Sequence, residues 1–166
     1  RSSSSELQSE ALVPVISTLH NEGVHVAVET CLFCPSTNLQ LALEMVDFFY
    51  VDMKILDTEI CKAVEHGNLS LYLSNLHTLL SWRDSEGRHK PVVIRIPVIG
   101  SYTDDQTNRK QVHDLIGEYK DSILKIELIK EHNLGESKYR SLCMQLDYHG
   151  VSDELMEKYK DELSDL

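Results

Sequence analysis

Four short runs of β-branched and other apolar residues recur along the chain, at 24–30, 48–53, 92–98 and 123–129. Apolar residues at helical spacing lie before, between and after these runs. Helix and strand therefore alternate regularly, and this order predicts βαβ units with a parallel sheet and right-handed crossovers. The second and third runs are close to continuously apolar, which is typical of strands covered on both faces. We expect an α/β fold.

The helical patterns carry start signals. Asn38 precedes an apolar stripe over 39–46 and is expected to cap that helix. Ser152 precedes a stripe over 155–163 and is a second expected cap. Two further stripes, over 69–80 and 112–119, indicate the helices that connect the later strands.

Size and charge limit the organisation and the partners. A chain of 166 residues is expected to form one domain. Residues 1–8 are expected to be a disordered or vector-derived start, and 9–166 the folded part. The net charge of −11 argues against nucleic acid and an anionic membrane surface as partners, because both attract basic faces. No apolar run approaches the length of a membrane span.

The cysteines are few, which indicates a reducing, cytoplasmic compartment. Cys31 and Cys34 form a C-x-x-C pair, a spacing found in redox pairs and in halves of zinc sites. A zinc site would need a second pair, and the sequence has none. We interpret the two as plain thiols.

Polar residues follow the apolar runs, at the strand ends where α/β folds bind ligands. Glu29 and Thr30 end the first run, and Asp52 and Lys54 end the second. Asp52 and Lys54 are two residues apart and therefore share a face of the strand. They form either a plain ion pair or a site for a zwitterionic ligand, in which the carboxylate holds an ammonium group and the lysine a carboxylate.

Two further residues are candidates. Arg95 lies inside an apolar run, where an unpaired arginine is rare. It is expected to form a buried salt bridge with Glu29, Asp52 or Glu127, or to bind an anion through its planar guanidinium, and both roles are compatible. His132 follows the fourth run, just before a glycine turn, which favours a ligand contact over a purely structural role.

Four blocks occur in the order found in one enzyme family: E-G-V-H-V-A-V-E-T, F-Y-V-D-M-K, V-V-I-R-I-P-V-I-G-S-Y-T-D-D and I-E-L-I-K-E-H-N-L-G-E-S-K-Y. With them the chain resembles the activating enzymes of glycyl radical enzymes, which use S-adenosylmethionine (SAM), and among these the pyruvate formate-lyase activating type. The resemblance implies a partial (β/α)6 TIM-type barrel, of which this chain supplies the last four βα units.

The resemblance also implies an activity and its cofactors. Enzymes of this family are oxidoreductases that cleave SAM reductively at a 4Fe–4S cluster and abstract a glycine hydrogen from a partner enzyme. Their cluster-binding C-x3-C-x2-C loop is absent from this sequence. The chain is therefore expected to be a SAM-binding portion that binds no cluster and is inactive alone. The implied partners are a glycyl radical enzyme of the pyruvate formate-lyase type and a one-electron donor such as flavodoxin.

Site roles carry over by position. The family's SAM contacts fall on seven residues here: Glu29, Thr30, Asp52, Met53, Lys54, Arg95 and His132. Glu29, Thr30 and Asp52 also lie where the family holds a monovalent cation. The sequence departs from the family pattern at Glu29, where aspartate is usual, and at Cys61, where histidine is usual. Two other readings remain open: a lyase that forms a Schiff base on Lys54, and a non-catalytic interaction domain.

Overall fold

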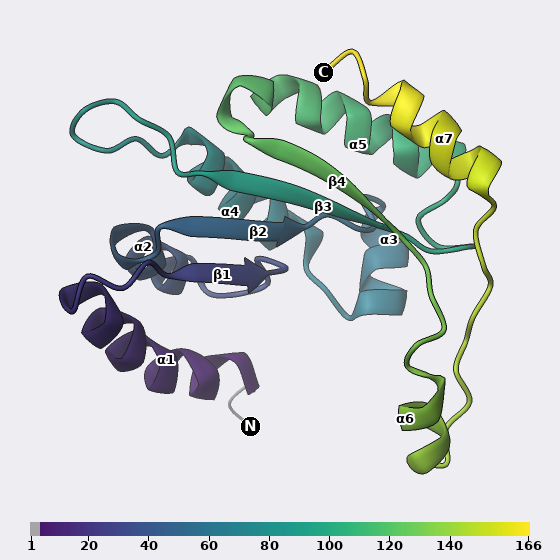
Figure 1. Cartoon of the computed structure of the whole chain (residues 1–166), viewed down its shortest axis with the longest axis horizontal. Helices are drawn as coiled ribbons and strands as arrows, with labels where there is room; N and C mark the ends of the chain where they lie inside the picture. Colours follow the sequence, from purple (N-terminus) through teal and green to yellow (C-terminus); the bar gives the residue numbers. More distant parts are fainter. Residues whose placement is uncertain (1–3) are drawn as a thin grey trace.

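The computed structural model describes residues 4–166, with side chains from residue 12 onward. The expected disordered start at 1–8 lies partly outside the described residues and stays a prediction. The chain forms an α/β fold with one four-stranded sheet (Figure 1). No described helix is both long and apolar enough to cross a lipid bilayer.

All strand pairs are parallel, and the spatial order of the strands follows their order in the chain. The strands are β1 (Ala27–Thr30), β2 (Phe48–Asp52), β3 (Val92–Val98) and β4 (Lys125–Lys130). This confirms the parallel α/β prediction. The first strand is shorter than expected because Val24 donates its amide N–H to Leu19, in the turn that ends the preceding helix. Among the described residues β1 pairs only with β2, so it is an edge strand.

The α-helices alternate with the strands. They are α1 (Ser4–Asn21), α2 (Ser36–Met45), α3 (Thr58–Ile60), α4 (Leu69–Ser81), α5 (Gln106–Tyr119), α6 (Glu136–Ser141) and α7 (Asp153–Glu162). The expected cap at Ser152 is confirmed, because its side chain accepts the N–H of Leu155. The expected cap at Asn38 is wrong. Helix α2 begins at Ser36, three residues earlier than expected, with Pro35 at the N-cap position.

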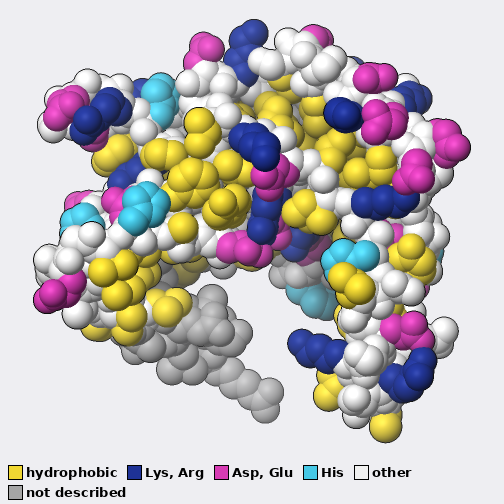
Figure 2. All heavy atoms as spheres, viewed as in Figure 1, with side chains coloured by type: hydrophobic (Ala, Val, Ile, Leu, Met, Phe, Trp, Pro, Cys, Tyr) yellow, Lys and Arg dark blue, Asp and Glu magenta, His cyan; other side chains and the backbone are white. Residues whose placement is uncertain are grey.

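Buried residues of α2, α4, α5 and α7 form one core with alternate residues of the strands, such as Phe49, Val51 and Ile94. The helices therefore cover one face of the sheet (Figure 1). The expectation that the second strand is covered on both faces is wrong, because its residues alternate between buried and half-buried. On the other face a band of acidic and basic side chains lies between hydrophobic ones (Figure 2). The open, partly polar face of the sheet is the natural place to look for a site.

Candidate functional site

The centre of the site is an arginine held by two carboxylates. Asp52 and Arg95 are paired in register on β2 and β3, so their side chains project from the same face. Arg95 donates from Nε and Nη2 to Oδ1 of Asp52, over 3.0 and 2.8 Å. Its Nη2 also pairs with Glu29 on β1. The hydrogen bond that Arg95 donates to Glu29, together with the pairing with Asp52, raises the pKa of Arg95, and the same guanidinium lowers the pKa of Glu29.

These contacts show which of the expected salt-bridge partners Arg95 has. Glu29 and Asp52 are its salt-bridge partners, while Glu127 pairs with Lys125 at 2.7 Å. Arg95 is only 16% exposed and its guanidinium lies 5.5 Å from the ring centre of Tyr50. The structural role is thus present, and any anion-binding role would have to be shared with it.

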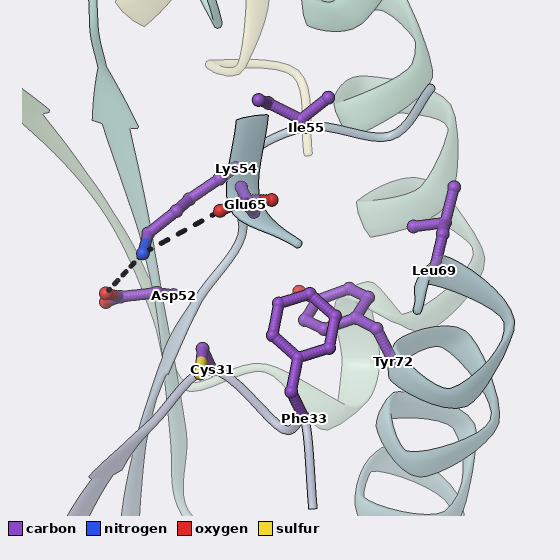
Figure 3. Close-up of a pocket in the computed structure, with 8 residues that line it drawn as sticks. All are labelled: Cys31, Phe33, Asp52, Lys54, Ile55, Glu65, Leu69 and Tyr72. Carbon is purple, nitrogen blue, oxygen red and sulfur yellow. Dashed lines mark ion pairs between the residues drawn. The ribbon is translucent and has the colours of Figure 1, made fainter. Parts of the chain in front are cut away.

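Lys54 extends the network by one step, because its ammonium lies 3.8 Å from Oδ2 of Asp52 (Figure 3). The same ammonium lies 3.8 Å from Oε1 of Glu65, which is 15% exposed. Sequence reasoning missed Glu65. It follows no apolar strand run, and only the path of the chain after β2 brings it back to Lys54. Five alternating charges result, from Glu29 through Arg95, Asp52 and Lys54 to Glu65.

The other three predicted site residues lie differently. Thr30 uses its hydroxyl to accept the N–H of Leu32, which turns the chain at the end of β1. The side chain of Met53 is 1% exposed in the core and is therefore closed to a ligand. His132 is exposed two residues beyond the end of β4. Among the contacts of the described residues, none joins His132 to the ion-pair network.

A small cavity lies beneath Lys54. Its lining comes from Cys31, Phe33, Asp52, Lys54, Ile55, Glu65, Leu69 and Tyr72 (Figure 3). Its volume of about 10 Å³ is room for about one water molecule. The buried hydroxyl of Tyr72 finds no partner among the described residues. Burial raises the pKa of Glu65, an effect that Lys54 opposes. The cavity itself is too small for a ligand larger than water.

The cysteines do not form a metal site. Cys31 and Cys143 are exposed, Cys34 is half-buried and Cys61 is buried, and all are free thiols. Among the side chains that the structure describes, from residue 12 onward, no three of His, Cys, Asp or Glu are grouped to hold a metal ion. A 4Fe–4S cluster needs several thiolates converging on one point. The described residues of this chain therefore do not fit such a cluster.

The comparisons with known proteins place these features in context. No protein-family model matches the chain. It is 30% identical over 160 residues to the 4-hydroxyphenylacetate decarboxylase activating enzyme of Clostridioides difficile strain CD196. This match covers 96% of this chain and 48% of that enzyme. It is 33% identical over 145 residues to the benzylsuccinate synthase activating enzyme of Thauera aromatica. This match covers 86% of this chain and 42% of that enzyme.

The chain thus spans less than half the length of these relatives. A crystallised domain of the pyruvate-formate lyase-activating enzyme of Bacteroides vulgatus ATCC 8482 has the same fold, with a TM-score of 0.77 and 19% identity. The match covers 99% of this chain and 91% of that domain. The resemblance to activating enzymes of glycyl radical enzymes is confirmed, and so is the fold expected from it.

Proposed function

We propose that this chain is the SAM-binding portion of an activating enzyme for a glycyl radical enzyme. The observation that carries the proposal is the similarity to such activating enzymes along nearly the whole chain. The ion-pair network on the open sheet face supports it independently, because it offers both charge signs to a zwitterionic ligand.

The donor set fits the amino-acid end of SAM. The carboxylates of Glu29 and Asp52 suit an ammonium group or a sulfonium centre, and the side chains of Lys54 and Arg95 suit a carboxylate. Lys54 is 33% exposed and Glu29 65% exposed, so both are accessible from solvent. Thr30, the backbone of Met53 and His132 complete the proposed set.

A monovalent cation near Glu29, Thr30 and Asp52 is part of the proposal. Both carboxylates already face Arg95, and the hydroxyl of Thr30 already accepts an N–H. A cation there would therefore have to share these oxygens with the guanidinium.

SAM bound beside a 4Fe–4S cluster supplies the hydrogen-abstracting chemistry of such enzymes. The residues described here would bind and orient SAM, and the cluster would have to come from thiolates outside them. We propose that the partner is a glycyl radical enzyme, of the pyruvate formate-lyase type, in the cytoplasm. A one-electron donor such as flavodoxin would supply the electron.

Reconstitution tests the proposal in two arms. The chain alone, treated with iron and sulfide, is expected to show no 4Fe–4S absorption and no 5′-deoxyadenosine above a no-protein control. The full product of the gene that encodes it is expected to show both with SAM and a reductant. 5′-Deoxyadenosine from the chain alone, or none from the full gene product, would contradict the proposal.

No observation favours the Schiff-base alternative on Lys54. Imine formation needs a neutral amine, which apolar burial or a neighbouring cation provides. Lys54 instead lies between two carboxylates. No observation on the described residues favours the third reading, a non-catalytic interaction domain.

A further inference from the structure

We propose that Glu65 is a positioning residue, which holds the ammonium of Lys54 beside Asp52 at the floor of the ligand site. The position of Lys54 follows from the structure alone, while SAM as the ligand rests on the proposed function. Glu65 has no part in the candidate site predicted from the sequence. Its role follows from three observations on the contacts and the backbone around it.

The first observation is that Asp52 alone cannot hold Lys54 firmly. Both hydrogen bonds from Arg95 converge on Oδ1 of Asp52. Only Oδ2 faces Lys54, at 3.8 Å, which is an ion-pair distance rather than a hydrogen bond. A lysine side chain has four rotatable bonds and loses rotamer freedom when it is fixed. A second carboxylate on the opposite side of the ammonium restricts it, and Glu65 lies there at the same distance.

The second observation is that the backbone is built to present Glu65. Helix α3 continues into a single π-helical turn, Cys61–Glu65, and such turns redirect side chains and are frequent at functional sites. His66 ends the turn with a left-handed φ of 54°. Gly67 follows, and a Cβ there would lie 2.6 Å from a ring carbon of Phe33 and 3.0 Å from Sγ of Cys61. The turn is therefore packed tightly, and its first residue, Cys61, is fully buried.

The third observation is that the carboxylate of Glu65 is partly desolvated, which costs free energy. Burial raises the pKa of its carboxyl group, while the ammonium of Lys54 lowers it and the carboxylate of Asp52 raises it further. The thiol of Cys61, on the same turn, also hydrogen-bonds the carboxylate, and Tyr72 and Cys31 line the cavity wall. An apolar residue at this position would avoid the desolvation cost. A carboxylate that fixes a ligand-binding lysine gives a reason for its presence.

Chemical modification of Lys54 tests the positioning directly and needs no ligand. The Glu65→Gln variant keeps the side-chain shape and removes the charge, and the exposed Glu59→Gln on α3 is the matched control. Acetic anhydride would be applied at pH 8 and acetylation followed by mass spectrometry, with exposed Lys62 as the internal standard. We expect Lys54 to react about threefold faster in Glu65→Gln, as loss of a half-exposed ion pair implies, and unchanged in Glu59→Gln. An unchanged Lys54 rate in Glu65→Gln would overturn the proposal.

SAM binding by calorimetry is the second readout. We expect Glu65→Gln to weaken SAM binding about fivefold at pH 7 and to have little effect when Lys54 is already replaced, in Lys54→Met. A merely structural Glu65 would weaken binding equally in both backgrounds, and that result would also overturn the proposal. If the wild type binds no SAM, the proposed function fails, and the acetylation rates still decide whether Glu65 positions Lys54. Unfolding curves confirm that each variant is folded.

Discussion

Replacing Arg95 with methionine is the sharpest test of the ion-pair network. The change removes two hydrogen bonds to Asp52 and the pair with Glu29, while methionine keeps much of the side-chain volume. A hydrogen bond to a charged group contributes about 1.5–3 kcal/mol when buried, and a pair with an exposed carboxylate about 0–1 kcal/mol. In this variant Asp52 keeps its ion pair with Lys54, and this limits the free-energy cost of losing the arginine.

The expected loss is therefore about 2 kcal/mol in the free energy of unfolding, or a fall in Tm of roughly 4–8 °C for a chain of this size. Urea unfolding followed by circular dichroism measures it, with the m-value expected to stay the same. Arg88→Met is the matched control, because Arg88 is 69% exposed in its ion pairs with Asp84 and Glu86. It should cost less than about 0.5 kcal/mol. Equal losses for the two variants would refute the reasoning.

Three other predictions concern single sites. Gly67→Ala should destabilise the protein by about 1–3 kcal/mol in urea unfolding, because the added Cβ would overlap neighbouring atoms. The control Gly117→Ala, in helix α5, should be neutral or stabilising by up to about 1 kcal/mol. Equal effects of the two variants on the free energy of unfolding would contradict this. Burial raises the pKa of Glu65, so its contribution to stability is favourable at low pH and is lost as pH rises through that pKa. Glu65→Gln should therefore gain stability relative to wild type as pH rises above the ordinary glutamate range, and a pH-independent difference would count against it. Iodoacetamide should alkylate exposed Cys31 well before Cys61, whose burial raises its thiol pKa, and equal rates by mass spectrometry would be inconsistent with the packing.

The sequence predicted the parts of the fold that have strong local signals. The strand at 92–98 was expected at its observed bounds, because it is a nearly continuous run of β-branched apolar residues. The shared face of Asp52 and Lys54 followed from their two-residue spacing. A buried partner for Arg95 followed from the cost of a lone charge in an apolar run.

The rest depended on features without a local signal. Glu65 reaches Lys54 only because a π-helical turn ends in a left-handed residue, and neither is visible in the pattern of apolar residues. Whether one or both faces of the sheet are covered is decided by the path of the helices, so the apolar run at 48–53 could not show it. His132 was expected beside the network from its strand-end position; it is exposed two residues beyond the end of β4, and its ligand contact stays a prediction.

The most direct test of the proposed function is a titration of the ¹⁵N-labelled chain with SAM, observed by NMR. The account predicts saturable shifts for the amides of Glu29, Asp52, Lys54 and Arg95 at SAM concentrations up to about 1 mM, the weak end of specific binding. Arg95→Met should abolish them, and Arg88→Met should leave them unchanged. Shifts confined to other surfaces, or identical shifts in Arg95→Met, would contradict SAM binding on the open face of the sheet.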